Sequence, residues 1–146
     1  MLIALPLLVI PVILYNIVVL SSLMGGGDQT GLAAGGADAI LRDSMLSIPM
    51  ASGTSWNVGV GDLILFLALI LLFFELLKST SSQKVAIVNH ALSMVLFIGV
   101  LVEFLLIKGF ATSTFFLIVA MVMLDVLAGF IVTIISARKD LDFGGA

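Results

Sequence analysis

The sequence contains no cysteine and very little charge. Its 146 residues include six Lys and Arg, nine Asp and Glu and one His, whereas 62% are hydrophobic. Without cysteine the chain has no disulfide framework, no thiolate metal site and no iron–sulfur cluster. A mean hydropathy of +1.35 excludes a soluble globular domain and a disordered chain, because so few charges cannot cover such an apolar core in water. We therefore predict an integral membrane protein.

Other functional classes are disfavoured by further absences. The net charge of −3 comes with no basic patch, so nucleic acid has no electrostatic footprint on the chain. No nucleophile elbow, phosphate-binding loop, dinucleotide fingerprint or zinc-protease helix motif is present. The chain has a single histidine, His90, which excludes bis-histidine haem ligation within the chain, and a zinc site would lack nitrogen and sulfur ligands. We expect a protein that is not an enzyme and has no intrinsic cofactor or metal, with lipid as its ligand.

Four apolar stretches are long enough to cross a bilayer, since about 20 helical residues span roughly 30 Å of hydrocarbon. We predict transmembrane helices at residues 1–24, 58–77, 85–107 and 114–137. The connections 78–84 and 108–113 are so short that the helices they join should form two tight antiparallel hairpins. The predicted fold is thus an all-α integral membrane protein with four transmembrane helices and a short cytoplasmic tail at 138–146.

The first connection, residues 25–57, is the only sizeable segment outside the predicted spans. Its Gly-rich start precedes a helical pattern over residues 38–48 that ends at Pro49. We predict a short amphipathic helix there, which lies on the membrane face or binds a partner protein. Its apolar, partner-binding residues are Ile40, Leu41, Met45 and Ile48. Trp56, just before the second span, is expected to anchor the chain at the membrane interface.

The Lys and Arg residues beside the spans predict the orientation, because these residues are enriched on the cytoplasmic side. One side carries Lys78, Lys84, Arg138 and Lys139, and the other carries Arg42 and Lys108. Both termini and the 78–84 connection are therefore expected to be cytoplasmic, and the long first loop extracytoplasmic. The compact chain and its plain N-terminus favour a bacterial inner membrane.

Ionisable groups at membrane depth need a partner, a water path or a role, because inserting each costs about 2.5–3.5 kcal/mol. Asp125 lies nearest the midplane and shares a helix face with Gly129 and Thr133. The favoured interpretation is a protonated or hydrogen-bonded Asp125 that joins the fourth span to a neighbouring helix. The alternative is a proton or cation site, with Glu103 as a second candidate. Glu103 is otherwise expected to reach the outer interface.

Glu75, Asn89 and His90 are predicted to lie at similar depth near the inner ends of the second and third spans. A hydrogen bond from Glu75 to Asn89 or to His90 would satisfy these groups. Asn89 and Ser93 share a face that should pack against protein. The spacing of Ala86 and His90 is similar to the Ala-x-x-x-His pattern of bacterial light-harvesting polypeptides. That resemblance implies His90 as the axial ligand of a chlorophyll-type pigment.

Two functions follow as expectations. The first is a non-catalytic accessory or assembly subunit that packs against a larger bacterial inner-membrane complex, such as a respiratory or photosynthetic electron-transfer assembly. The near absence of aqueous domains and the uncharged first span favour it. The second is a small homo-oligomeric transporter or channel that uses Asp125 to couple protons or cations. It is less favoured because only the stripe around Asp125 brings polar groups to the midplane.

Overall fold

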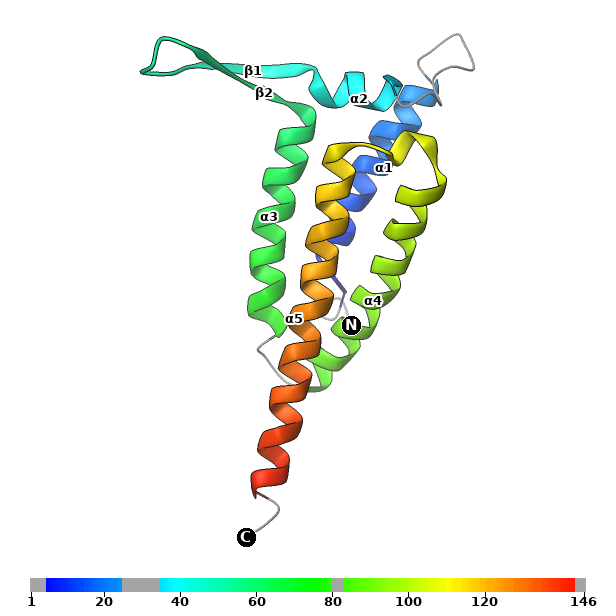
Figure 1. Cartoon of the computed structure of the whole chain (residues 1–146), viewed down its shortest axis with the longest axis vertical. Coiled ribbons are helices and arrows are strands. Elements are labelled where there is room, and N and C mark those ends of the chain that lie inside the picture. The colour runs from blue at the N-terminus through cyan, green and yellow to red at the C-terminus, as the bar shows by residue number, and fades with distance from the viewer. Residues whose placement is uncertain (1–4, 25–34, 80–82, 144–146) are drawn as a thin grey trace.

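The computed structural model of the chain describes residues 5–24, 35–79 and 83–143, which form a mostly helical bundle (Figure 1). Three of its helices, α3, α4 and α5, are long and apolar enough to cross a membrane, which indicates a membrane location. The helices are α1 (Val9–Met24), α2 (Gly35–Arg42), α3 (Val60–Ser79), α4 (Gln83–Leu106) and α5 (Ser113–Phe143). A 3-10 turn, η3 (Lys108–Phe110), precedes α5, and strands β1 (Ser44–Pro49) and β2 (Ser55–Gly59) precede α3.

Helix α5 is the central element of the bundle. It lies between α3 and α4 in Figure 1, and it packs closely along both of them. Helices α3 and α4 contact each other less than either contacts α5, although they are neighbours in sequence. Helix α1 packs mainly on α2 and α3. The expected side-by-side pairing of the second and third spans is therefore largely replaced by contacts that both make with α5.

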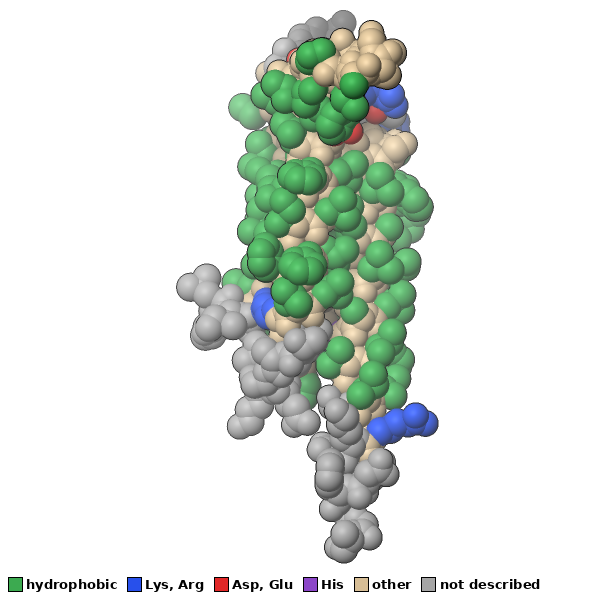
Figure 2. All heavy atoms as spheres, turned by 90° about the vertical axis from the view of Figure 1, so that its left-hand side faces the viewer, with side chains coloured by type: hydrophobic (Ala, Val, Ile, Leu, Met, Phe, Trp, Pro, Cys, Tyr) green, Lys and Arg blue, Asp and Glu red, His purple; other side chains and the backbone are tan. Residues whose placement is uncertain are grey.

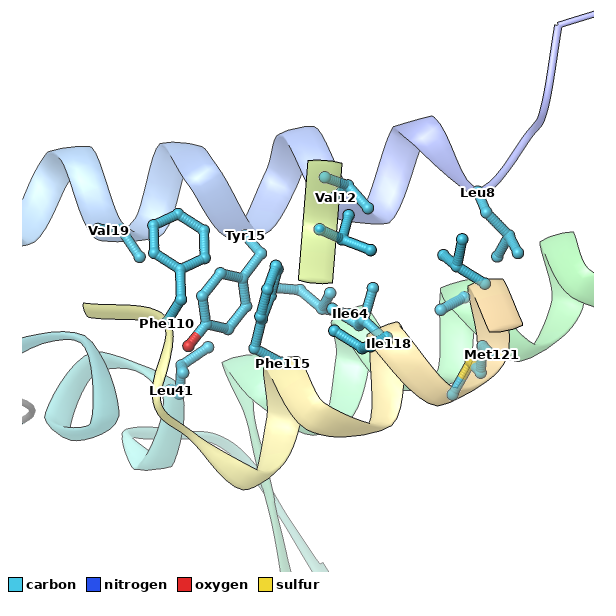
Figure 3. Packing of buried hydrophobic residues seen from close by; sticks show 14 of the residues in the cluster. Leu8, Val12, Tyr15, Val19, Leu41, Ile64, Phe110, Phe115, Ile118 and Met121 are labelled. Carbon is cyan, nitrogen blue, oxygen red and sulfur yellow. The ribbon is translucent and has the colours of Figure 1, made fainter. Parts of the chain in front are cut away.

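We call the end of the bundle that carries α2 and the β1–β2 hairpin the outer end and the opposite end the inner end, and these names mark only position in the bundle (Figure 1). The apolar core runs along the bundle from Leu8 and Met121 to an aromatic group at the outer end (Figure 3). Tyr15 of α1 lies between Phe110 and Phe115, with ring centroids 5.4 and 4.6 Å away. Its buried hydroxyl shares a short hydrogen bond with the Thr112 hydroxyl, which also accepts the Phe115 backbone N–H at 3.2 Å. Thr112 is therefore the N-terminal cap of α5 and the partner of the Tyr15 hydroxyl. This pair fixes the middle of α1 to the start of α5.

The predicted amphipathic helix at 38–48 is wrong beyond Arg42, where α2 ends, and the mostly helical fold therefore also contains a small two-stranded sheet. After Arg42 the chain continues as strand β1, which pairs antiparallel with β2. The tight turn between the two strands contains Gly53, whose φ is +82°. Leu46 lies opposite Val58, and Ile48 lies opposite Trp56. Aliphatic and aromatic side chains gain cross-strand contacts in this arrangement that a single helix would not give them. The sequence window that suggested a helix did not include the second strand.

Helix α2 packs on the outer end of the bundle through Ala37 and Leu41, which are both buried. The approach is close: a Cβ atom on Gly59 would lie 2.7 Å from the backbone oxygen of Leu41. A Cβ atom on Gly61 would lie 2.9 Å from the Thr114 hydroxyl oxygen. The two glycines therefore let α2 and α5 contact the start of α3.

Several element boundaries differ from the prediction. Helix α3 begins at Val60 because residues 58–59 belong to β2, and the Asp62 carboxylate accepts the Gly59 N–H at 2.9 Å, which caps the helix. Helix α5 continues to Phe143, so residues 138–143 of the expected tail are helical. Helix α1 begins at Val9, after a turn in which the Pro6 carbonyl accepts the Val9 N–H. Residues 1–4, 25–34, 80–82 and 144–146, which belong to the predicted first span, loops and tail, lie outside the described residues.

The close contact at Gly59 gives a direct test of the packing of α2 against the end of β2, just before α3. Gly59→Ala places a methyl group against the Leu41 backbone, so it should lower the free energy of unfolding by about 1–3 kcal/mol. Gly99→Ala in α4 is the matched control, because a Cβ atom there meets nothing within 4 Å. Both variants are measured by SDS titration in mixed micelles. Equal stability of the two variants would contradict the packing described.

Candidate functional site

The fully buried carboxylate of Glu75 is the centre of a polar cluster near the inner end of the bundle. It accepts the backbone N–H of Leu7 at 2.7 Å and a hydrogen bond from the side-chain amide of Asn89. Leu7 contacts Oε2, whereas the Lys78 ammonium lies 3.3 Å from Oε1, the oxygen that Asn89 also contacts. Glu75 therefore joins α3 to α4 and to the segment that begins α1.

The contact with Leu7 has a clear physical reason. Leu7 lies in the turn that leads into α1, and N–H groups at the start of a helix have no partner within it, so in an apolar environment each needs one from elsewhere. A carboxylate is a favourable partner because the N-terminal end of a helix carries partial positive charge. Lys78 also donates to the backbone oxygen of Leu5. The inner end of α3 thus holds the start of α1 through one anion and one cation.

Asp125 lies in the same region, on the face of α5 that packs against α4. It is buried, lies beside Ser93 and is within electrostatic range of Glu75, Lys78 and His90. The cluster contains four buried side-chain atoms without a hydrogen-bond partner among the described residues. These atoms are Asn89 Oδ1, His90 Nδ1, Ser93 Oγ and Asp125 Oδ2. The amide oxygen and the carboxylate oxygen accept, whereas the hydroxyl and the imidazole nitrogen can donate or accept, so a hydrogen-bond donor or a cation would satisfy the two acceptors.

The predicted stripe of Asp125, Gly129 and Thr133 is only partly an interhelical surface. Gly129 makes room for His90, since a Cβ atom there would overlap the imidazole ring. Thr133 is exposed and donates to the Gly129 carbonyl of its own helix at 2.8 Å. Asp125 and Gly129 therefore face α4, whereas Thr133 makes a local hydrogen bond instead of joining two helices.

Glu103, the second candidate for an ion site, lies apart from the cluster. It follows Ser93 by ten residues on α4, which is about 15 Å along the helix. Its carboxylate accepts a long hydrogen bond of 3.4 Å from Asn16 of α1, which also donates to the Val12 carbonyl. The structure therefore does not bring Glu103 and Asp125 together.

The residues predicted in the first loop occupy three different environments. Leu41 is buried in the chain's own core, and Ile40 is half-buried on α2. Met45 and Ile48 lie on β1, with Met45 exposed. Trp56 lies on β2 and is also exposed. The four residues expected on one helix face are thus divided between α2 and β1, and Leu41 is not free to bind a partner.

Two polar contacts of the structure were not predicted from the sequence. Lys78 was treated only as a flanking charge, yet it contacts Glu75 and Leu5. Tyr15 is the only tyrosine, and a hydroxyl within an apolar span needs a buried partner, which was the available signal for its pairing with Thr112. The amide of Leu7 carries no signal in the sequence, because every residue other than proline has one.

The cluster can bind a proton, a cation or water, but its polar groups do not continue toward the outer surface. On that side of Asp125 the core is apolar, and its residues include Ile64, Ala68, Val100, Ile118 and Val122. No group of three or more His, Asp or Glu residues that could hold a metal ion occurs within the described ranges.

Known families, curated proteins and solved structures give no match to this chain. The side chain of Ala86, from the pigment-binding pattern, lies outside the described residues.

The cluster predicts that Glu75 contributes far more to stability than Glu103. Glu75→Gln keeps the shape of the side chain but places an amide among three donors, so it should cost about 2–4 kcal/mol of unfolding free energy. Glu103→Gln, with one long hydrogen bond near the surface, should cost less than about 1 kcal/mol. SDS titration of the purified variants measures both. A smaller effect at Glu75 than at Glu103 would refute the role assigned to Glu75.

Proposed function

We propose that the chain is a non-catalytic accessory or assembly subunit that packs against a larger complex of the bacterial inner membrane. A respiratory or photosynthetic electron-transfer assembly is the kind of complex we infer. The observation that carries the proposal is the division between an apolar outside and polar groups that are directed inward. Glu75, whose side chain is fully buried, holds helices of this chain together, and its carboxylate is already occupied by Leu7, Asn89 and Lys78.

The proposal includes α1 as a fourth span, with both termini in the cytoplasm. The start of α1 is bound by Glu75 near the inner end of α3. Tyr15, further along α1, reaches the Gly109 carbonyl and Thr112 in the connection between α4 and α5. Contacts at both ends of the bundle support a helix that follows its full length. The excess of Lys and Arg at the ends of α3 and α5 supports the cytoplasmic assignment.

The outward surface of the bundle supports contacts with lipid and with other membrane helices. Figure 2 views the side of α3 and shows hydrophobic side chains over most of its height. Exposed residues of this kind on α3 include Leu63, Phe66, Leu69, Ile70, Phe73 and Phe74. Such a surface fits a hydrocarbon environment or a neighbouring subunit. A chain with this outside has little that could bind a soluble substrate.

A second candidate function is a homo-oligomeric proton- or cation-coupled transporter or channel that uses Asp125. The observation in its favour is the set of unpartnered buried atoms around that carboxylate. The apolar core between Asp125 and the outer surface opposes it, since a pathway needs polar groups through the whole bilayer. We therefore place it second.

Purification from the native membrane tests the proposal. The full chain with a C-terminal tag is extracted in a mild detergent, separated by size and examined by mass spectrometry and absorption spectroscopy. We expect larger membrane subunits at fixed stoichiometry in the same fraction. Haem or pigment bands in that fraction would identify an electron-transfer assembly. A colourless homo-oligomer alone would contradict the subunit proposal.

Asp125→Asn is the matched control for this experiment. Asn can still form hydrogen bonds between helices, so the variant should recover the same subunits as the wild-type chain. The purified chain should also conduct no protons or monovalent cations in liposomes loaded with a pH-sensitive or ion-sensitive dye. Ion flux in the wild-type protein that Asp125→Asn abolishes would establish the second candidate function.

A further inference from the structure

The β1–β2 hairpin projects sideways from the outer end of the bundle. In Figure 1 it runs roughly perpendicular to the long helices and extends beyond α3. Strand β2 leads directly into α3, so the base of the hairpin is fixed to the first turn of that helix. If α3 crosses a membrane, the hairpin therefore lies along the membrane surface.

The strand register gives the hairpin one apolar and one polar face. Residues directly opposite each other in an antiparallel pair point to the same face, and successive pairs alternate. The pairs of Leu46 with Val58 and of Ile48 with Trp56 therefore form one face. The pairs Ser47 with Asn57 and Pro49 with Ser55 form the opposite face. The first face contains only apolar side chains, and we call it the apolar hairpin face.

The apolar hairpin face is uncovered away from the bundle. Val58, at its base, is buried, but Leu46 and Trp56 are each 55% exposed. A two-stranded hairpin with such a face is only marginally stable in water. Residues 44–59 contain no charged side chain. An uncharged, two-faced hairpin has no electrostatic means to select a protein partner, whereas it suits the boundary between lipid headgroups and acyl chains.

We propose that the apolar hairpin face inserts into the outer surface of the phospholipid bilayer and that Trp56 is its anchor. Figure 2 looks from the side on which the hairpin projects and shows hydrophobic side chains along the bundle below it, so lipid in contact with that side also reaches the hairpin. Helix α3, which follows the hairpin directly, exposes Leu63 and Phe66 in its first two turns. Tryptophan is favoured at this depth because its ring is apolar and its N–H group is polar. The inference does not rest on the proposed function, because it concerns the chain alone in a bilayer.

The sequence allows a clean test, because Trp56 is the only tryptophan. The purified full chain is reconstituted in phosphatidylcholine vesicles, and its fluorescence is measured with acrylamide in the water or with brominated lipids in the bilayer. We expect blue-shifted emission, several-fold stronger quenching by lipids brominated near the headgroup than by lipids brominated near the chain end, and weak quenching by acrylamide.

A matched control places the probe on the other face of the hairpin. The double variant Trp56→Phe and Ser47→Trp moves the indole to the polar face while it keeps an aromatic ring opposite Ile48. Its emission should be red-shifted and quenched strongly by acrylamide. Acrylamide quenching of wild-type Trp56 as strong as in this variant would overturn the proposal. Protection of Trp56 from both acrylamide and brominated lipid would also overturn it, since a second copy of the chain would then cover the face.

Discussion

The rest of the bundle depends on how one carboxylate, Glu75, is satisfied in an apolar environment. An isolated charge is very costly to bury, so its partners must come from the protein itself. The structure supplies them from the backbone of Leu7, from Lys78 and from Asn89. Each partner would itself be costly to bury without a hydrogen bond, so each contact removes the cost of burying two unpaired polar groups. The inner end of the bundle is therefore specified by polar contacts, and the outer end by the packing around Tyr15.

The sequence predicted the features that depend on local composition. Long apolar runs located both ends of α3 and α4 within two residues and the start of α5 within one, whereas α5 ends six residues later than predicted. The short 78–84 connection predicted a hydrogen bond from Glu75 to Asn89 or to His90, and the structure has the one to Asn89. The β1–β2 hairpin was missed because its stability depends on pairs such as Ile48 with Trp56, which a helical reading of one strand ignores. The contact between Glu75 and Leu7 joins positions 68 residues apart through a backbone group, so no side-chain pattern marks it. Contacts between distant segments are thus what the sequence left undetermined.

The two ends of the molecule suit different environments, and this asymmetry supports the proposed role. At the inner end the ionisable groups face one another across α3, α4 and α5. At the outer end an uncharged hairpin and a buried aromatic core lie beside the exposed ion pair of Arg42 with Asp38 on α2. Only the unpartnered atoms beside Asp125 are not explained by packing, and they are the reason that a proton or cation site stays as the second candidate.

A double-mutant cycle on Glu75 and Asn89 tests most directly whether buried polar contacts hold the bundle together. The free energies of unfolding of Glu75→Gln, Asn89→Leu and the double variant are compared with that of the wild-type chain in mixed micelles. Because the two side chains share a buried hydrogen bond, we predict that their effects couple by about 1 kcal/mol or more. Effects that add within about 0.3 kcal/mol would mean that the two residues act independently, which would contradict the account.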